Sequence, residues 1–258
     1  YNLPSPSAPK GPVPRRVPEG TVPLVAVEGT AFECGLWYGE TIRKKYPDDL
    51  KKISGSKWWK NMSNDAKRLY ERHIPYIFDI FRGLAKGVGE IKADDSTCEP
   101  RSSGCTSFAV SGAVTLDGHP ITGQTKDPSI DRIPRYVVIR MRIKGAPSIL
   151  GLSYPGGFGG HGMWSTGMSV MGNSLYSSGD ADGRLSMEEW CRLAFSGSSV
   201  HEAVDLARRF GIQGRGNYLV SDGQGESRSI EFNVGGVSVL DPREGILTHG
   251  NHAEGQET

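Results

Sequence analysis

The feature that most constrains the fold of this chain is a change in sequence pattern at Gly104-Cys105. Before it, apolar residues recur at three- and four-residue steps, which predicts helices over residues 30–45 and 64–91, the second broken or kinked at Pro75. After it, apolar residues alternate or run in short blocks between turn signals, which is typical of strands. Helices followed by strands, a helix pair and further strands predict a layered α+β fold.

The strand-rich part is predicted to begin with a hairpin that starts at Cys105 and turns at residues 117–118. Two later helices are each expected to open with a capping box, over residues 186–189 and 199–202. The other strands are predicted at residues 22–27, 136–143, 148–154, 168–171, 218–221, 229–234, 237–240 and 246–249.

Glycine makes up 35 of the 258 residues, and 25 of these lie from Cys105 onward, where hairpins need tight turns. No Gly-X-Y period is present, and 36% apolar residues argue against a disordered chain. The predicted organisation is a proline-rich arm over residues 1–24, a helical segment over 25–104 and a strand-rich segment over 105–258. The last two are expected to fold as one unit.

Charge and cysteine content exclude several classes of partner. The formal net charge is +1, so neither nucleic acid nor an anionic membrane is an expected partner. The sequence contains no run of 18 apolar residues, so it predicts no membrane span. Four cysteines without a CxxC spacing predict neither a disulfide scaffold nor zinc, and His249 and His252 lack a third ligand at a recognisable spacing. No metal and no cofactor are therefore expected.

Cys105 is the leading candidate for chemistry, because it lies between a stretch of small residues, 101–104, and a predicted strand. If the bond after Gly104 were cut, Cys105 would carry a thiol and a free α-amine, a group whose ordinary pKa is about 7.7–8.0. The neutral amine would serve as general base for the thiol, and the thiolate is the nucleophile. A buried structural cysteine, or a thiol–imidazole dyad with His161 or His249, are alternatives that the residues leave open.

Several short motifs occur in order over residues 25–252. They are residues 27–35 (VEGTAFECG), 38–40 (YGE), 81–87 (FRGLAKG), 104–110 (GCTSFAV), 123–127 (GQTKD), 167–175 (GMSVMGNSL), 217–225 (NYLVSDGQG), 230–231 (IE) and 249–252 (HGNH). Through this ordered set the chain resembles the acyl-coenzyme A:6-aminopenicillanic acid acyltransferase (isopenicillin N acyltransferase)-like family. That family is peptidase family C45 of the N-terminal-nucleophile (Ntn) hydrolases.

The resemblance implies a four-layer αββα sandwich, with two antiparallel sheets between helical layers. It also implies that Gly104-Cys105 is cleaved autocatalytically and that Cys105 is the nucleophile. Asp127 matches a polar residue that contacts the nucleophile's amine or the substrate. Asn217 matches an asparagine near the oxyanion, and Asn173 is a second candidate amide donor.

Three further residues are assigned to substrate binding: Thr106, Phe158 and His161. Thr106 follows the nucleophile and is expected to help position the thiol. Phe158 and His161 belong to a glycine-rich stretch, residues 156–162, which lacks the spacing of a phosphate-binding loop and is interpreted as a substrate-side loop. Because the family's chain continues past residue 252, the 105–258 segment is expected to be incomplete at its C-terminal end.

The predicted function is a self-processing cysteine amidohydrolase or acyltransferase that cleaves a small N-acyl amide through an acyl-enzyme on Cys105. The alternatives are an acyl-coenzyme A-dependent N-acyltransferase, which would use an acyl thioester, and a non-catalytic, unprocessed binding homologue. The expected partners are the small acyl substrate, the two segments of the same precursor and a further copy of the chain in a homo-oligomer. A reduced thiol at position 105 favours a cytoplasmic location.

Overall fold

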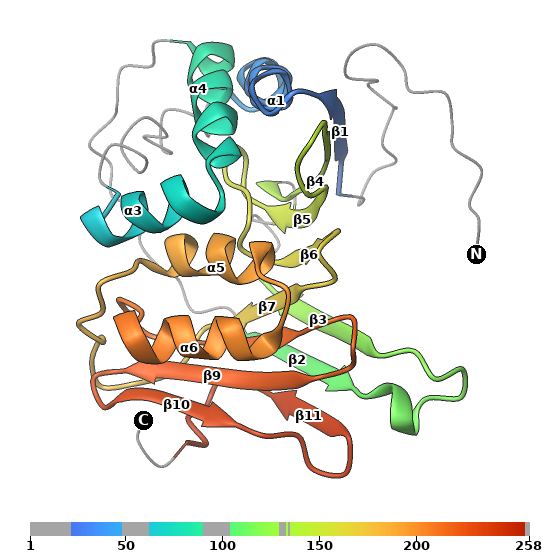
Figure 1. Cartoon of the computed structure of the whole chain (residues 1–258), viewed down its shortest axis with the longest axis vertical. Coiled ribbons are helices and arrows are strands. Elements are labelled where there is room, and N and C mark those ends of the chain that lie inside the picture. Colours follow the sequence, from blue (N-terminus) through green and yellow to red (C-terminus); the bar gives the residue numbers. More distant parts are fainter. Residues whose placement is uncertain (1–21, 48–61, 90–103, 129–132, 134, 256–258) are drawn as a thin grey trace.

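The computed structural model describes residues 22–47, 62–89, 104–128, 133 and 135–255. These residues form three stacked layers, which are a layer of helices, a large sheet and a small sheet (Figure 1). The predicted α+β class and the sandwich of two sheets are confirmed.

The large sheet has eight strands in the order β1-β4-β5-β6-β7-β8-β9-β10. Every neighbouring pair is antiparallel except β1 and β4 at one edge, which run parallel. The expectation of two antiparallel sheets is therefore wrong at this edge. The strands are β1 (Leu24–Gly29), β4 (Val137–Ile143), β5 (Ile149–Ser153), β6 (Gly162–Trp164), β7 (Ser169–Asn173), β8 (Gly216–Ser221), β9 (Ser227–Asn233) and β10 (Gly236–Leu240).

Strand β1 comes from the helical segment and β4 from the strand-rich segment, so the two segments share one sheet. Their pairing supports the expectation that both fold as one unit.

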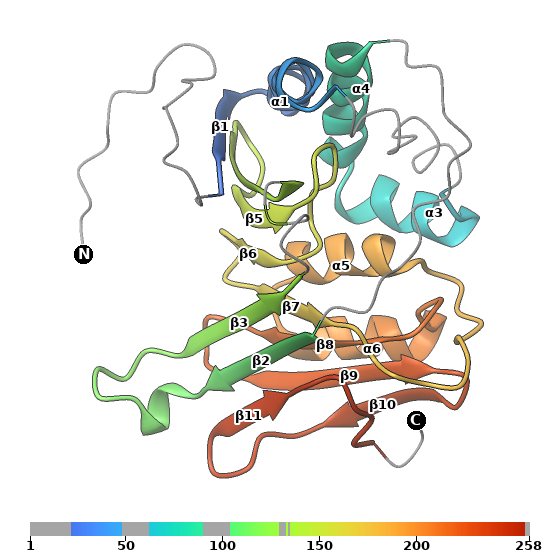
Figure 2. The same ribbon diagram turned by 180° about the vertical axis from the view of Figure 1, so that it is seen from behind.

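The small sheet has the order β11-β2-β3 and is antiparallel throughout. It packs face to face on the large sheet through contacts of β2 with β7 and β8 and of β11 with β9 (Figure 2). In the described part of the chain no helix covers the outer face of the small sheet, so the second helical layer of the expected αββα sandwich does not appear there. The strands are β2 (Gly104–Val110), β3 (Ile121–Asp127) and β11 (Ile246–His249).

The α-helices of the described residues all lie on the other face of the large sheet (Figure 1). The predicted break at Pro75 is confirmed, because one helix ends at His73 and the next begins at Tyr76. The loop that joins β2 to the next strand contains a short 3-10 helix, Gly112–Val114. The α-helices are α1 (Ala31–Lys45), α3 (Asn64–His73), α4 (Tyr76–Val88), α5 (Met187–Ser196) and α6 (Val200–Phe210).

Glycines allow α1 and α4 to pack at very short range. A Cβ on Gly35 would lie 2.1 Å from the carbonyl oxygen of Ile80, and one on Gly83 would lie 2.0 Å from that of Phe32. No side chain fits in either position, since real Cβ contacts are never so short. This close approach fixes the helix pair against the β1 edge of the large sheet.

The two predicted capping boxes have different outcomes. Ser186 and Glu189 form a complete capping box at the start of α5. At the start of α6, Ser199 accepts from the Glu202 N–H, but the Glu202 carboxylate turns instead to the N–H and hydroxyl of Ser198. The second prediction is therefore half correct: the side-chain cap is present and the reciprocal bond is not.

Some predictions lie outside the described residues. They are residues 1–21 of the proline-rich arm, residues 101–103 before Gly104, and Cys98, which is one of the four cysteines.

Candidate active site

The β2–β3 hairpin places Cys105 between the two sheets. Cys105 is the second residue of β2 and is 3% exposed. Strand alternation directs Cys105, Ser107 and Ala109 towards the large sheet and Thr106 towards solvent on the outer face. The predicted nucleophile is thus an interior residue of the small sheet, and Thr106 projects from the opposite face.

The other two cysteines that the structure describes are poor nucleophiles. Cys34 and Cys191 lie in the helix-side core. Burial raises the pKa of the Cys34 thiol to about 11 and also raises that of the Cys191 thiol. Cys105 differs because a cationic side chain lies beside its sulfur.

That cation is Lys126, the cross-strand partner of Cys105 in β3. Its Nζ lies 3.5 Å from the Cys105 sulfur and donates a 2.5 Å hydrogen bond to the Gly172 carbonyl in β7. Burial lowers the pKa of the Lys126 ammonium, and the neighbouring Cys105 sulfur acts in the opposite direction. Lys126 is thus the cationic group that contacts the Cys105 sulfur.

Gly172 joins several polar groups of the site. The ladder between β6 and β7 ends at the Gly162–Val170 pair, so the Gly172 backbone has no strand partner on that side. Its N–H donates instead to His161 Nδ1 at 3.1 Å, and its carbonyl accepts from Lys126 and from Gln124 Nε2. Burial, helped by the charge of Lys126, lowers the pKa of His161 to about 3, so this imidazole is neutral.

Asn173 holds the two sheets together beside the nucleophile. Its Nδ2 donates to the Ser107 hydroxyl at 2.9 Å and to the His249 carbonyl at 2.9 Å, and its Oδ1 accepts from Gln124. These bonds join β7 to all three strands of the small sheet. The amide donors of Asn173 are therefore already used within the protein.

Asn217 lies directly across from Asn173 in the β7–β8 ladder and is fully buried. Its Nδ2 donates to the Ser229 hydroxyl, whereas its Oδ1 has no hydrogen-bond partner. A buried unpaired amide oxygen is costly, and one N–H of the same amide also stays available. The Asn217 amide thus has spare hydrogen-bonding capacity in this interior.

The segment after β11 reaches the nitrogen of the nucleophile. Asn251 Oδ1 accepts a 2.8 Å hydrogen bond from the Cys105 N–H, and Asn251 Nδ2 donates to the Ser174 carbonyl. The segment is anchored just before this point by His249, whose Nε2 lies 2.5 Å from Glu231 Oε1 with both side chains fully buried. Asn251 therefore has a fixed position opposite the Cys105 nitrogen.

Glu231 also binds the chain beyond Asn251. Its two carboxylate oxygens accept from the N–H groups of Glu254 and Gly255 at 2.7 and 2.8 Å. Burial alone lowers the pKa of His249, but the bonds to Glu231 and to the Gly250 carbonyl outweigh it and leave that pKa raised. The Glu231–His249 pair thus fixes the chain both before and after Asn251.

The structure places the other predicted residues away from the sulfur. Asp127 is exposed on the outer face and lies opposite Gly104, where a Cβ would be 3.0 Å from Asp127 Oδ2. Phe158 is 2% exposed and packs on Phe81 in the helix-side core, under the guanidinium of Arg192. Asp127 therefore adjoins the proposed cleavage site, and Phe158 is part of the core.

Sequence reasoning missed Lys126, Gln124 and Asn251. Lys126 and Gln124 lie in the 123–127 motif beside Asp127, but strand alternation faces them inward and Asp127 outward. Pairing Gly104 with Asp127 in the predicted hairpin would have found Lys126 opposite Cys105. Asn251 lies in the 249–252 motif, but nothing in that motif links it to Cys105, because the two residues are 146 positions apart in the chain.

The described residues contain neither a candidate metal site nor a candidate membrane-spanning helix. Among them, no group of three or more His, Cys, Asp or Glu side chains is placed to hold a metal ion. No helix in that same part of the chain has the length and apolarity needed to cross a membrane.

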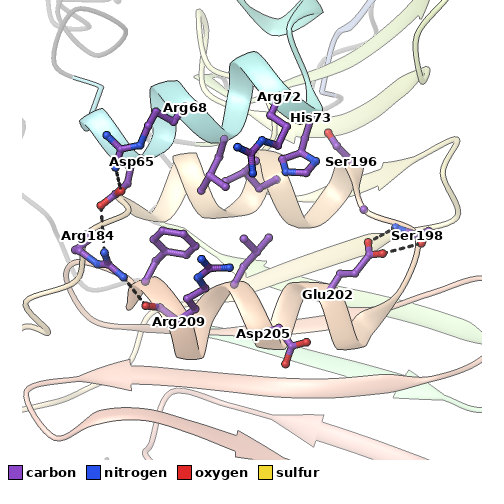
Figure 3. A pocket seen from close by; sticks show the side chains of 15 residues that line it. Asp65, Arg68, Arg72, His73, Arg184, Ser196, Ser198, Glu202, Asp205 and Arg209 are labelled. Carbon is purple, nitrogen blue, oxygen red and sulfur yellow. Dashed lines mark hydrogen bonds and ion pairs between the residues drawn. The ribbon is translucent and has the colours of Figure 1, made fainter.

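A cavity of about 960 Å³ lies between α3, α5 and α6 (Figure 3). Arginines and acidic residues line it, with several paired internally, such as Arg184 with Asp65. The helices that form it cover the face of the large sheet opposite to the one that carries the small sheet. The cavity is therefore separate from Cys105.

Comparison with known proteins gives structural neighbours only. No protein-family model matches the chain, and no curated protein matches it. Two solved structures of conjugated bile acid hydrolase variants from Clostridium perfringens are 17% identical, with TM-scores of 0.43 and 0.32. The matched regions cover 59% and 60% of this chain, and 54% and 47% of the two hydrolase chains.

A third neighbour is penicillin V acylase from Agrobacterium tumefaciens, which is 15% identical with a TM-score of 0.30. It covers 56% of this chain and 43% of its own. This chain thus spans about half the length of the structures it matches.

Proposed function

We propose that this chain is a cysteine amidohydrolase of the N-terminal-nucleophile type, with Cys105 as the nucleophile and a small N-acyl amide as the substrate. The observation that carries the proposal is the surroundings of Cys105: Lys126 Nζ lies 3.5 Å from its sulfur, and Asn251 Oδ1 lies 2.8 Å from its nitrogen. The sulfur and the nitrogen of the residue are thus both held by side chains from another strand or segment. The sequence motifs around residues 104–110 and 249–252 support the same assignment.

The proposal includes self-processing at Gly104-Cys105. Cleavage converts the Cys105 N–H into an α-amine at the position where Asn251 already accepts a hydrogen bond. This amine then takes the thiol proton during turnover, and the thiolate attacks the substrate carbonyl. Glycine at position 104 fits this step, because a side chain there would crowd Asp127 Oδ2 at 3.0 Å.

The charge that develops on the substrate oxygen needs a hydrogen-bond donor. We assign this role to Asn217, whose amide keeps one N–H free after its bond to Ser229. Asn173 would act by fixing Ser107 and β11, since its own N–H groups are engaged. Water then releases the acyl group from Cys105, whereas an amine in place of water would give acyl transfer.

The test compares the intact masses of the wild-type chain, Cys105→Ala and the matched control Cys191→Ala after expression. We expect a new N-terminus at Cys105 in the wild type and in Cys191→Ala, and an uncleaved Cys105→Ala chain. The cleaved proteins should hydrolyse N-acyl amides from a panel and form an acyl adduct on Cys105. Uncleaved wild type would contradict self-processing, and cleaved protein that neither hydrolyses nor forms an adduct would contradict the amidohydrolase assignment. Product formed with an added amine, but not with water, would instead indicate an acyltransferase.

A further inference from the structure

Self-cleavage raises a chemical problem that the α-amine cannot solve. While the Gly104-Cys105 bond is intact, the Cys105 nitrogen belongs to a peptide bond and donates its hydrogen to Asn251 Oδ1. A peptide nitrogen is not basic, so it cannot take the thiol proton. The step that creates the α-amine therefore needs a different base.

Few titratable groups of the described residues lie near the Cys105 thiol and could act as that base. His161 Nδ1 accepts the Gly172 N–H, and His249 Nε2 is bound to Glu231. Asp127 projects from the outer face of β3, away from the interior that holds the thiol. Lys126 remains, with its Nζ 3.5 Å from the Cys105 sulfur.

The surroundings of Lys126 suit proton exchange. The titratable groups that face it are the Cys105 thiol from β2 and His161 from the segment before β6, while Gln124 and the Gly172 carbonyl are neutral. The acidic side chain next to it in sequence, Asp127, lies on the other face of the strand. Desolvation lowers the pKa of the Lys126 ammonium, as it does in lysines that act as general bases.

We propose that Lys126 takes the thiol proton of Cys105 in the uncleaved chain and so acts as the base for self-cleavage. The inference rests on the self-processing stated under Proposed function. The Cys105 thiolate attacks the Gly104 carbonyl carbon, and the Lys126 ammonium returns the proton to the Cys105 nitrogen as the carbon–nitrogen bond breaks. Water then hydrolyses the Gly104 thioester, which leaves a Gly104 carboxylate and a Cys105 with a free thiol and a free α-amine.

Lysine would thus work once, before the α-amine exists, and would afterwards remain as a cation beside the sulfur. This division gives each nitrogen a distinct step: Lys126 for maturation and the α-amine for turnover. It also gives a functional reason for a lysine at this buried position, because the pairing of β2 with β3 does not itself require a charged side chain there.

The experiment starts from uncleaved chain, recovered from inclusion bodies directly into urea at pH 4 before it can fold, and then diluted into buffer between pH 6 and 10. Intact mass follows cleavage with time, and short pulses of iodoacetamide with peptide mapping measure the alkylation of Cys105 in chain that is still uncleaved. The variants are Lys126→Met, which removes the charge, Lys126→Arg, which keeps a charge but cannot give up a proton at these pH values, and Lys144→Met, an exposed control. Circular dichroism checks that each variant refolds.

We expect Lys126→Met to slow cleavage by at least about 100-fold and to slow alkylation of Cys105, with no plateau in the pH profile. Lys126→Arg should restore alkylation but not cleavage, and Lys144→Met should match the wild type. Cleavage and alkylation of Lys126→Met at wild-type rates would overturn the inference, and so would normal cleavage of Lys126→Arg. If no chain cleaves, self-processing and the role of Lys126 as its base are both refuted, and slower alkylation of Lys126→Met then shows only that the charge of Lys126 activates the thiol.

Discussion

The two faces of the eight-stranded sheet have opposite chemistry. On the face covered by helices, β8 and β9 present Tyr218, Val220, Ile230 and Phe232 to a single large apolar core. On the face covered by the small sheet, the intervening residues of the same strands include Asn217 and Glu231, and the apolar cluster there consists of only Ala109, Leu219 and Leu247 with two partly buried neighbours. Strand alternation thus separates packing from polar chemistry across one sheet.

The difference shows how this fold can hold reactive polar groups in its interior. Apolar burial on the helix side supplies the driving force for folding, because stabilisation scales with the apolar area removed from water. The polar interior stabilises less, since each buried polar group must recover in hydrogen bonds what it loses in hydration. The Glu231 carboxylate does so through His249 and two backbone N–H groups. The four predictions below test this division.

The largest effect on stability is expected on the helix side, from Trp190→Ala. Trp190 is fully buried, donates to the Ala203 carbonyl and packs edge-on against Tyr218. Its truncation should lower the free energy of unfolding by about 3–5 kcal/mol, measured by urea denaturation. Between the sheets, Leu219→Ala should cost less than Leu185→Ala, an equally buried leucine of the helix-side core, because the apolar cluster of Leu219 is smaller. An equal or greater loss in Leu219→Ala would contradict the division of roles.

The next effect concerns Glu231→Gln in the polar interior. This change removes the carboxylate that raises the pKa of His249 and should cost about 1.5–3 kcal/mol at pH 6. A raised folded-state pKa gives stability that is complete below the unfolded value of about 6.5 and is lost as the pH rises through the folded value. The difference between wild type and Glu231→Gln should therefore shrink between pH 6 and pH 9. A difference that stays constant in urea titrations across this range would rule out a charged His249.

A smaller effect on stability, but a clear effect on activity, is expected for Asn251→Ala. The variant loses the 2.8 Å bond from the Cys105 N–H, which should cost about 0.5–1.5 kcal/mol. Because the nitrogen of the nucleophile is then no longer oriented, kcat/KM for amide hydrolysis should fall by about 10- to 100-fold, with Asn251→Asp as the conservative comparison. A fall in stability with unchanged kcat/KM would make Asn251 a purely structural residue.

The smallest effect is expected for Thr106→Ala, on the outer face of the small sheet. Thr106 is exposed and projects away from the sulfur of its neighbour, Cys105. Its removal should change the free energy of unfolding by no more than about 0.5 kcal/mol and leave kcat/KM within about twofold. A tenfold loss of activity would show that substrate crosses the outer face of β2, as the original assignment of Thr106 to substrate binding requires.

Much of the fold could be predicted from local sequence. Pro75 ends a helix because its ring prevents regular hydrogen bonding, and the Ser186–Glu189 pair caps α5 because both partners are three residues apart. The parallel pairing of β1 with β4 could not be predicted, because it joins segments more than 100 residues apart. The missing reciprocal bond at α6 has a local cause, because the Glu202 carboxylate accepts hydrogen bonds from Ser198 instead.

The candidate site divides in the same way. The sequence alone determined that Cys105 begins a strand after a glycine, and that its neighbours alternate between two faces. Only the tertiary structure decided which groups meet the thiol. Lys126, rather than Asp127, lies beside the sulfur because the β2–β3 register pairs it with Cys105, and a shift of one residue would exchange the two faces. Gly172 reaches the site from β7 and Asn251 from the segment after β11, and their positions depend on how the two sheets pack.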